Sequence, residues 1–358
     1  MSERSERLAQ GTTSAFLSLV LTALVVFGQQ GCEESITPVK GFEVEPVNQA
    51  ATELKRKCVE ILRPKLHAGD LQTRLKVALA LSSARDPAGL EDARAIMGGR
   101  SRETGLRAAH YFARNGLTPA EAAIADAEAM VKKARGSLRY LAVTTLGYSP
   151  RQDVKDMLKS ISDDASDRDL QVCAACALAR KADHQAIEWL RMNVSTWLGF
   201  EGFDPFLFAR VADEGAMLKL MDSLEAGVDS RTRNAIMAAE AKRDNRSLSS
   251  LPILMTRKHG IRRTMAAAVL AELGGREGSN VLKEAVGQPV LALPEAAWAA
   301  MGLGSLGDPV GIWSLVKFLE KEQDTDKGVE AASLILPCLE SPGYAVSASF
   351  QLWISVNM

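Results

Sequence analysis

Two cysteines three positions apart are the first candidates for chemistry in this chain. Cys173 and Cys176 have the Cys-x-x-Cys spacing that occurs in redox motifs and in metal sites. They lie within an alanine-rich stretch, from Leu170 to Ala179, that is typical of a closely packed helix. Neither a second cysteine pair nor a nearby histidine completes a metal set. The sequence favours two small packing residues on a helix, and we expect no metal and no other cofactor.

The histidines and the glycine-rich pieces give no catalytic motif. His67, His110, His184 and His259 each lie in a different segment, and the sequence has no His-Glu-x-x-His helix. It also has no Gly-x-x-x-x-Gly-Lys phosphate loop and no Gly-x-Ser-x-Gly nucleophile elbow. From these absences we predict that the protein is not an enzyme.

One stretch concentrates aromatic residues. Trp197, Phe200, Phe203, Phe206 and Phe208 lie within twelve positions. Because aromatic side chains dominate many protein interfaces, Trp197, Phe200, Phe203 and Phe206 are candidate partner-binding residues. The alternative is that the rings fill the core where one structural unit packs irregularly on the next.

The elements that must position these residues are helices that recur about every 32 residues, a period typical of helical repeats. Residues 270–274, Leu-Ala-Glu-Leu-Gly, superpose on residues 303–307, Leu-Gly-Ser-Leu-Gly, at an offset of 33. The first helix of each unit is rich in alanine and leucine. Its predicted ends fall near Ala84, Arg114, Leu146, Leu178, Arg210, Ala241, Leu273, Leu306 and Cys338.

Helix-starting sequences separate the first helix of a unit from the second. They are Asp86-Pro87, Thr118-Pro119, Ser149-Pro150 and Asp308-Pro309. Asp, Ser or Thr accepts hydrogen bonds from the free amides of a helix N-terminus, and proline fits the first helical position. Each unit is therefore predicted to be a helical hairpin.

These units resemble the short HEAT-like repeats of bilin lyases, in the pieces Arg107-Ala108-Ala109, Leu306-Gly307 and Asp308-Pro309. The resemblance covers about residues 70–339. It implies an all-α solenoid, a superhelix of about eight or nine antiparallel two-helix repeats, with a concave surface lined by the second helices. It also implies an alternative function, as a lyase or chaperone-like protein acting on a chromophore or a partner protein. The His-Glu pairs of the di-iron HEAT hydroxylases are missing.

The N-terminus resembles the signal of a bacterial lipoprotein. Arg4 and Arg7 precede an uncharged apolar run over residues 15–27, and Gly31 stands directly before Cys32. In that family the signal is cleaved before the cysteine, which then carries lipid. The resemblance implies a protein anchored through Cys32 on the extracytoplasmic side of a bacterial cell envelope. An ordinary cleaved signal, an uncleaved anchor and a cytoplasmic protein remain alternatives.

Charge and segment boundaries complete the sequence-based prediction. With 43 basic and 44 acidic residues the net charge is -1, which disfavours bulk electrostatic attraction to nucleic acid, so we predict no nucleic-acid partner. The predicted segments are a signal peptide at 1–31, a lipidated tether with an N-terminal capping helix at 32–68, the repeat solenoid at 69–343, and a C-terminal cap or tail at 344–358. The predicted function is a non-catalytic, membrane-anchored protein-interaction scaffold with an unknown protein partner.

Overall fold

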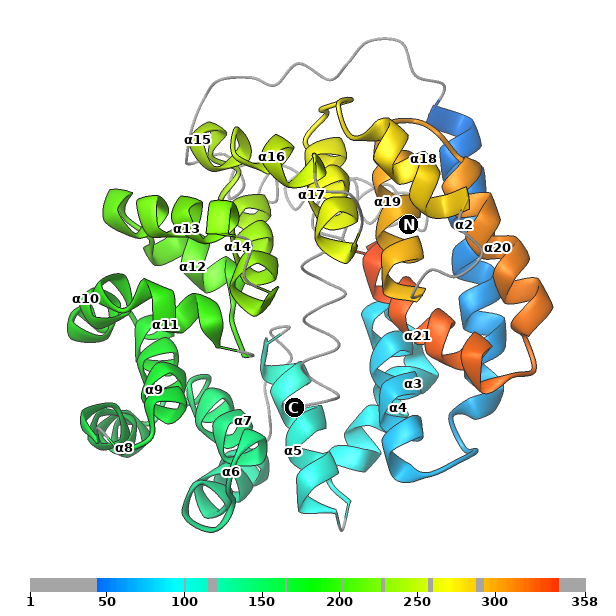
Figure 1. Ribbon diagram of the computed structural model, residues 1–358. Coiled ribbons are helices and arrows are strands. Elements are labelled where there is room, and N and C mark those ends of the chain that lie inside the picture. The colour runs from blue at the N-terminus through cyan, green and yellow to red at the C-terminus, as the bar shows by residue number, and fades with distance from the viewer. Residues whose placement is uncertain are drawn as a thin grey trace, which may run out of the picture. The chain divides into compact units, whose positions relative to one another are not determined.

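The computed structural model describes residues 44–99, 101–114, 121–164, 166–200, 202–226, 229–256, 260–287 and 293–340. All of these residues belong to one of the two units of the chain, residues 43–358. They form helices and turns without a strand, so the predicted all-α repeat fold is confirmed (Figure 1). The predicted signal peptide, Cys32 and the predicted C-terminal segment 344–358 lie outside the described residues.

The helices alternate between two sets. The first helices of the units are Leu71–Ser83 (α3), Arg102–Arg114 (α5), Ser137–Leu146 (α7), Arg168–Arg180 (α9), Pro205–Val211 (α12), Asp229–Lys242 (α14), Ile261–Glu272 (α17), Leu293–Ser305 (α19) and Asp326–Glu340 (α21). The second helices are Pro87–Met97 (α4), Glu121–Lys133 (α6), Gln152–Asp163 (α8), His184–Met192 (α10), Glu214–Ala226 (α13), Asn245–Leu248 (α15) with Leu251–Met255 (α16), Ser279–Gly287 (α18) and Val310–Glu322 (α20). Val44–Leu62 (α2), with a short 3₁₀ turn at Arg63–Lys65, precedes the first unit, and Val194–Gly199 (α11) is an extra helix. Every predicted end of a first helix falls within two residues of the observed one.

A common hinge joins the two helices in four units. After α3, α9, α17 and α19, a backbone N–H donates to the carbonyl of a leucine five positions earlier: Asp86 to Leu81, Asp183 to Leu178, Gly275 to Leu270 and Asp308 to Leu303, over 2.8–3.1 Å. The preceding residue has a positive φ, which stops the helix with a left-handed residue. Glycine occupies that position at Gly274 and Gly307, but Arg85 and Ala182 occupy it with φ values of 57°.

An arginine near the start of the first helix ties three units to the preceding helix or turn. Its Nε donates to a backbone carbonyl eight residues earlier, in the pairs Arg74 to Leu66 (2.8 Å), Arg139 to Val131 (3.0 Å) and Arg263 to Met255 (3.2 Å). The last carbonyls of a helix lack partners within that helix, so an arginine that reaches back satisfies one of them.

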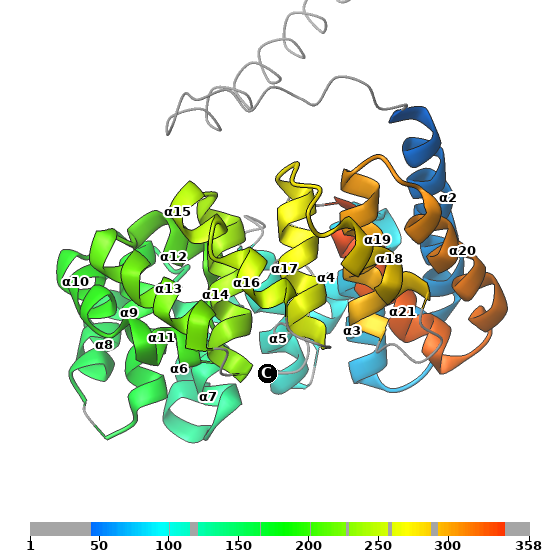
Figure 2. The same cartoon turned by 45° about the horizontal axis from the view of Figure 1, so that its top comes forward.

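The first helices form the inner layer of the described unit. Successive first helices pack closely against one another, as α5 does on α7, α7 on α9, and α17 on α19. The second helices spread apart on the outside (Figures 1 and 2). Alanine makes this possible, because small side chains let neighbouring helix axes approach, and the alanines of α9 and α17 are buried. This corrects the prediction that second helices line the concave surface.

The two ends of the repeat array meet. Helix α2 packs on both α20 and α21, and α21 packs on α3, the first helix of the first unit. One hydrophobic core cluster accordingly joins Leu54 and Leu75 with Ile312 and Leu336. The described helices therefore close into a ring (Figure 1). Helix α2, predicted to cap an end of the array, lies at the junction of its two ends.

Candidate functional site

The Cys-x-x-Cys pair lies on α9 inside the core. Cys173 and Cys176 are both buried and both free thiols. Burial raises the pKa of the Cys176 thiol to about 12 and raises the pKa of Cys173 as well. A thiol with a raised pKa is a poor nucleophile, because the thiolate is the reactive form. Cys173 and Cys176 thus lie in the hydrophobic core, where the sequence analysis expected small packing residues. Within the described ranges, no group of three or more His, Cys, Asp or Glu residues is arranged to hold a metal ion.

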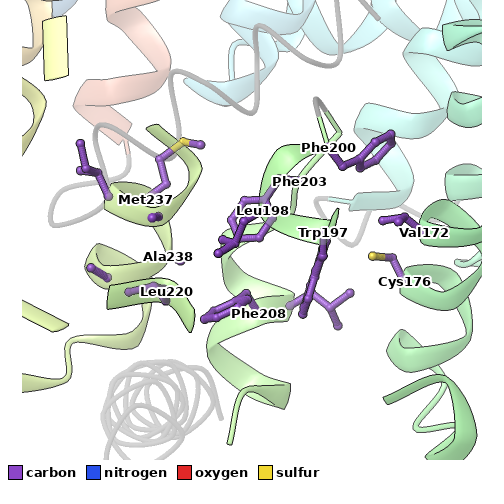
Figure 3. Close-up of a cluster of buried hydrophobic side chains, with 14 of the residues drawn as sticks. Val172, Cys176, Trp197, Leu198, Phe200, Phe203, Phe208, Leu220, Met237 and Ala238 are labelled. Atoms are coloured by element: carbon purple, nitrogen blue, oxygen red, sulfur yellow. The ribbon is translucent and has the colours of Figure 1, made fainter. Parts of the chain in front are cut away.

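The aromatic cluster also packs in the core. The rings of Trp197, Phe203 and Phe208 are fully buried, with centroids 5.1–5.8 Å apart, and Phe200 is nearly so. Figure 3 shows these side chains between α9 on one side and α13 and α14 on the other. Phe206 differs, since 40% of it is exposed. Of the four predicted partner-binding residues, Phe206 is the one that reaches the surface.

Two polar side chains fix the irregular segment that carries the rings. Asn234 of α14 donates from Nδ2 to the carbonyls of Leu198 (2.7 Å) and Phe200 (2.9 Å). These bonds hold the chain where it leaves α11. Asp204 then starts α12, because one of its carboxylate oxygens accepts from the N–H groups of Phe206 and Leu207, each over 3.1 Å.

Asp204 is also the centre of a buried ionic cluster, which we define as His110, Arg114, Tyr148, Arg180 and Asp204. Its Oδ2 lies 2.7 Å from Arg180 Nη2, and its Oδ1 lies 3.8 Å from Arg114 Nη2. Burial acts to raise the pKa of the Asp204 carboxyl, but the positive charges of Arg114 and Arg180 outweigh it and the pKa is lowered. The carboxylate is therefore ionised at neutral pH.

His110 completes the buried ionic cluster from α5. Its Nδ1 is 3.3 Å from the hydroxyl oxygen of Thr145, and its ring meets Tyr148 edge to face at 5.9 Å. The Arg180 guanidinium lies over the same Tyr148 ring, 5.0 Å from its centroid. Burial, followed by the charges of Arg114 and Arg180, lowers the pKa of His110 to about 3. The imidazole is therefore neutral at pH 7.

The buried ionic cluster ties together the ends of α5, α7 and α9 and the start of α12. The sequence analysis did not find it, although Asp204-Pro205 repeats the helix-starting pair seen at Asp86-Pro87 and Asp308-Pro309. Because one carboxylate, that of Asp204, is shared by Arg114 and Arg180 from two other helices, its effect is to fix the relative positions of these helices. The buried ionic cluster has a structural role, and the candidate binding residues lie elsewhere, on the surface.

The surface offers a different candidate, the outer apolar row, which we define as Met192, Leu218 and Ile253. Their exposed fractions are 68%, 44% and 51%. They stand on α10, α13 and α16, three successive outer elements in which α13 contacts both neighbours. The Nζ of Lys219 donates to the Met192 carbonyl over 3.1 Å, which brings the end of α10 against α13 beside Leu218.

Acidic residues flank the outer apolar row. Glu214 and Asp222 lie four positions before and after Leu218 on α13, so the three side chains share one face of the helix, and all three are exposed. A signal for this row exists in the sequence, since Leu218 is a large apolar residue at a position where the helical period expects a polar one. The sequence alone does not show which face of α13 points outward, so this signal can be recognised only with the structure.

Comparisons with known proteins identify no close relative. No protein-family model matches the chain, and no curated protein matches it. Among solved structures, human deoxyhypusine hydroxylase in complex with glycerol matches with 17% sequence identity and a TM-score of 0.34. The match covers 82% of this chain and 97% of that one.

The matched protein is an enzyme. The prediction that the chain is not an enzyme is corrected by this finding: the absence of catalytic motifs, on which it relied, does not decide the matter. At this TM-score and identity, the likeness assigns no reaction, substrate or residue role to this chain.

Proposed function

We propose that this protein is an interaction protein of a bacterial cell envelope, held at the membrane by lipid on Cys32, and that it binds a partner protein over the outer apolar row. The observation that carries the proposal is the exposure of Met192, Leu218 and Ile253 on three successive outer elements.

Single exposed apolar side chains are ordinary on protein surfaces, but neighbouring ones on a common face are characteristic of interfaces. Full burial of one such side chain contributes about 1.5–3 kcal/mol. The three side chains stand on contacting helices that are fixed in the ring, so a partner that covers them pays little entropy for ordering these helices.

The charges around the row define the kind of partner. Glu214 and Asp222 place carboxylates on both sides of Leu218; Glu214 already pairs with Arg246 over 3.2 Å, so Asp222 is the carboxylate that would attract a basic partner. A complementary segment carries apolar side chains flanked by lysine or arginine, because opposite charges across an interface speed association and select against other partners. We therefore propose a protein segment with alternating apolar and basic residues, and no nucleic acid.

The membrane attachment rests on the sequence, in which Gly31 precedes Cys32 after an apolar run. None of the described helices combines the length and the apolar character needed to span a bilayer. In this proposal the anchor is the lipidated cysteine, and stable attachment requires more than one acyl chain.

Site-specific crosslinking in intact cells tests partner binding. A photo-reactive amino acid at position 192, 218 or 253 is expected to give one discrete adduct, identified by mass spectrometry. The matched control is position 310, because Val310 is 59% exposed on α20 and belongs to a different part of the surface. Leu218→Glu should abolish the adducts at 192 and 253 while leaving the melting temperature unchanged. Equal adducts from position 310, or adducts that persist in Leu218→Glu, would contradict the proposal.

Metabolic labelling with palmitate tests the anchor independently. The wild-type protein is expected to carry the label and to fractionate with membranes, whereas Cys32→Ala should lose both properties. Labelling that survives in Cys32→Ala would refute the assignment of the lipid to this cysteine.

A further inference from the structure

The junction between the two ends of the array contains a cysteine pair that the repeat pattern does not explain. Cys58 lies on α2 and Cys338 lies on α21. Both side chains are fully or almost fully buried and belong to the same hydrophobic core cluster. They are 280 positions apart in the sequence, so the closure of the ring is what brings their helices into contact.

The direction of α2 at the junction follows from its contacts with α20. Val47 and Ile312 both lie beside Gly304, since a Cβ built there would be 3.9 Å from Val47 Cγ1 and 2.8 Å from Ile312 Cδ1. Ten residues further along α2, Lys57 Nζ is 3.8 Å from Glu320 Oε1. Helix α2 therefore runs parallel to α20. Because a short turn joins α20 to α21 as a hairpin, α2 runs antiparallel to α21.

A salt bridge sets the register of α2 on α21. Lys55 Nζ lies 2.5 Å from Glu340 Oε1. In an antiparallel pair, one turn forward from Lys55 to Cys58 corresponds to a step back from Glu340 to Cys338. The two cysteines are thus at the same level of the helix pair. The pKa of the Cys58 thiol is raised by burial and then by Cys338, which agrees with two thiols that lie close to each other, and the Cys338 thiol donates to the Leu334 carbonyl of its own helix over 3.3 Å.

We propose that Cys58 and Cys338 are a modification site, and that a disulfide between them closes the ring covalently. In the cell this rests on the proposed extracytoplasmic location, where disulfides form and persist. The described state, in which neither cysteine forms a disulfide, is the reduced form.

The reaction is thiol–disulfide exchange with a disulfide-carrying oxidant, either a protein or a small molecule. The Cys58 thiolate attacks one sulfur of the oxidant, breaks its S–S bond and expels one thiolate. The Cys338 thiolate then attacks the Cys58 sulfur of the mixed disulfide and expels the second thiolate. The two cysteine protons pass to the two thiolates released, so the oxidant ends as two thiols and the protein gains one disulfide.

Burial dictates when this exchange occurs. An oxidant cannot reach two buried thiols while α2 lies on α21, and a raised pKa leaves little thiolate. The oxidant therefore reacts with Cys58 before the junction packs, Cys338 attacks the mixed disulfide as α2 and α21 come together, and the finished disulfide is shielded from soluble reductants.

Refolding provides the decisive test because it does not depend on location. The reduced, unfolded full-length chain is refolded with oxidised glutathione, free thiols are alkylated, and peptides are identified without reduction. The expected product is one crosslinked pair containing Cys58 and Cys338, with Cys32, Cys173 and Cys176 alkylated. Its melting temperature should exceed that of the same chain refolded in reductant by about 5–10 °C. Cys173→Ala/Cys176→Ala should keep this difference, and Cys58→Ala/Cys338→Ala should lose it.

A refolded, oxidant-treated protein in which Cys58 and Cys338 are both alkylated would overturn the disulfide. This failure is separable from failure of the proposed function, because palmitate labelling of Cys32 reports the anchor alone. In cells, the membrane fraction is expected to contain the crosslinked peptide pair. A labelled membrane protein with both thiols free would also overturn the proposal.

Discussion

Acidification from pH 7 to pH 5 should destabilise this protein through one buried histidine. His110 is enclosed between α5 and α7, where Thr145 and Tyr148 contact it, and the cations of Arg114 and Arg180 oppose its protonation. The negative charge of Asp204 acts in the opposite direction but does not prevail. The folded protein therefore holds this imidazole neutral.

The magnitude follows from the pKa in the two states. In the folded protein the pKa of His110 is lowered to about 3, whereas an unfolded histidine has a pKa of about 6.5. Between these values the unfolded chain binds one more proton than the folded one, so stability falls as the pH falls. At pH 5 the unfolded imidazole is almost fully protonated and the folded one is not. Integration from pH 7 to pH 5 gives a loss of about 2 kcal/mol in the free energy of unfolding.

The assay is urea unfolding followed by far-ultraviolet circular dichroism at pH 7, 6 and 5, with His110→Gln as the reference. The variant keeps a hydrogen-bonding group opposite Thr145 but cannot titrate. Wild type should lose about 2 kcal/mol more than the variant over this range. Parallel pH dependences in the two proteins would show that His110 does not remain neutral, and would refute the reasoning.

Three further predictions concern stability and use the same unfolding assay. Ala182→Gly should stabilise the protein by about 0.5–1 kcal/mol, because glycine adopts the positive φ of this turn without strain. The control Ala179→Gly, inside α9, should destabilise the protein. A change of stability in the same direction in both variants would contradict this reasoning. Asp204→Asn keeps an oxygen to start α12 but removes the negative charge that Arg114 and Arg180 share. The free energy of unfolding should fall by about 3–5 kcal/mol. A fall below about 1 kcal/mol would mean that the buried ionic cluster does not hold its helices together. Trp197→Ala should cost about 3–5 kcal/mol because the ring is fully buried, whereas Phe206→Ala should cost about 1 kcal/mol or less; similar costs at the two positions would argue against this division between core and surface.

The repeat ladder was predictable because its signals are local. Alanine and leucine at helical spacing mark the first helices, and Asp86-Pro87 marks the start of α4 as predicted. Helix α20 begins one residue later than Asp308-Pro309 predicts, α8 begins at Gln152 after Ser149-Pro150, and Thr118-Pro119 lies outside the described residues. The Leu-x-x-x-Gly hinge is visible at residues 270–274 and 303–307. The same turn is not recognisable in the sequence at Arg85 and Ala182, because neither residue is a glycine although both have a positive φ.

The closure of the ring and its inner layer were not predictable in this way. Both depend on the angle added at each interface between units, which is set by the packing of many side chains and accumulates along the array. The buried ionic cluster was also not predictable, because Asp204 pairs with Arg180 and Arg114, which are far from it in the sequence. The outer apolar row requires knowledge of which face of α13 points outward. For the aromatic stretch, the sequence left core and interface as alternatives, and the structure places Trp197, Phe200 and Phe203 in the core.

The contact of α21 with α3 and α2 has a consequence for how such a chain can change over evolutionary time. Open repeat arrays tolerate duplication or deletion of a module, since each module needs support only from its immediate neighbours. Here the final module must land on the initial one, and a gain or loss of one hairpin would displace it by a full module and separate the two terminal helices. The number of modules is therefore fixed by the need to keep the two terminal helices in contact. Sequence divergence can then proceed by substitution or by lengthening of turns.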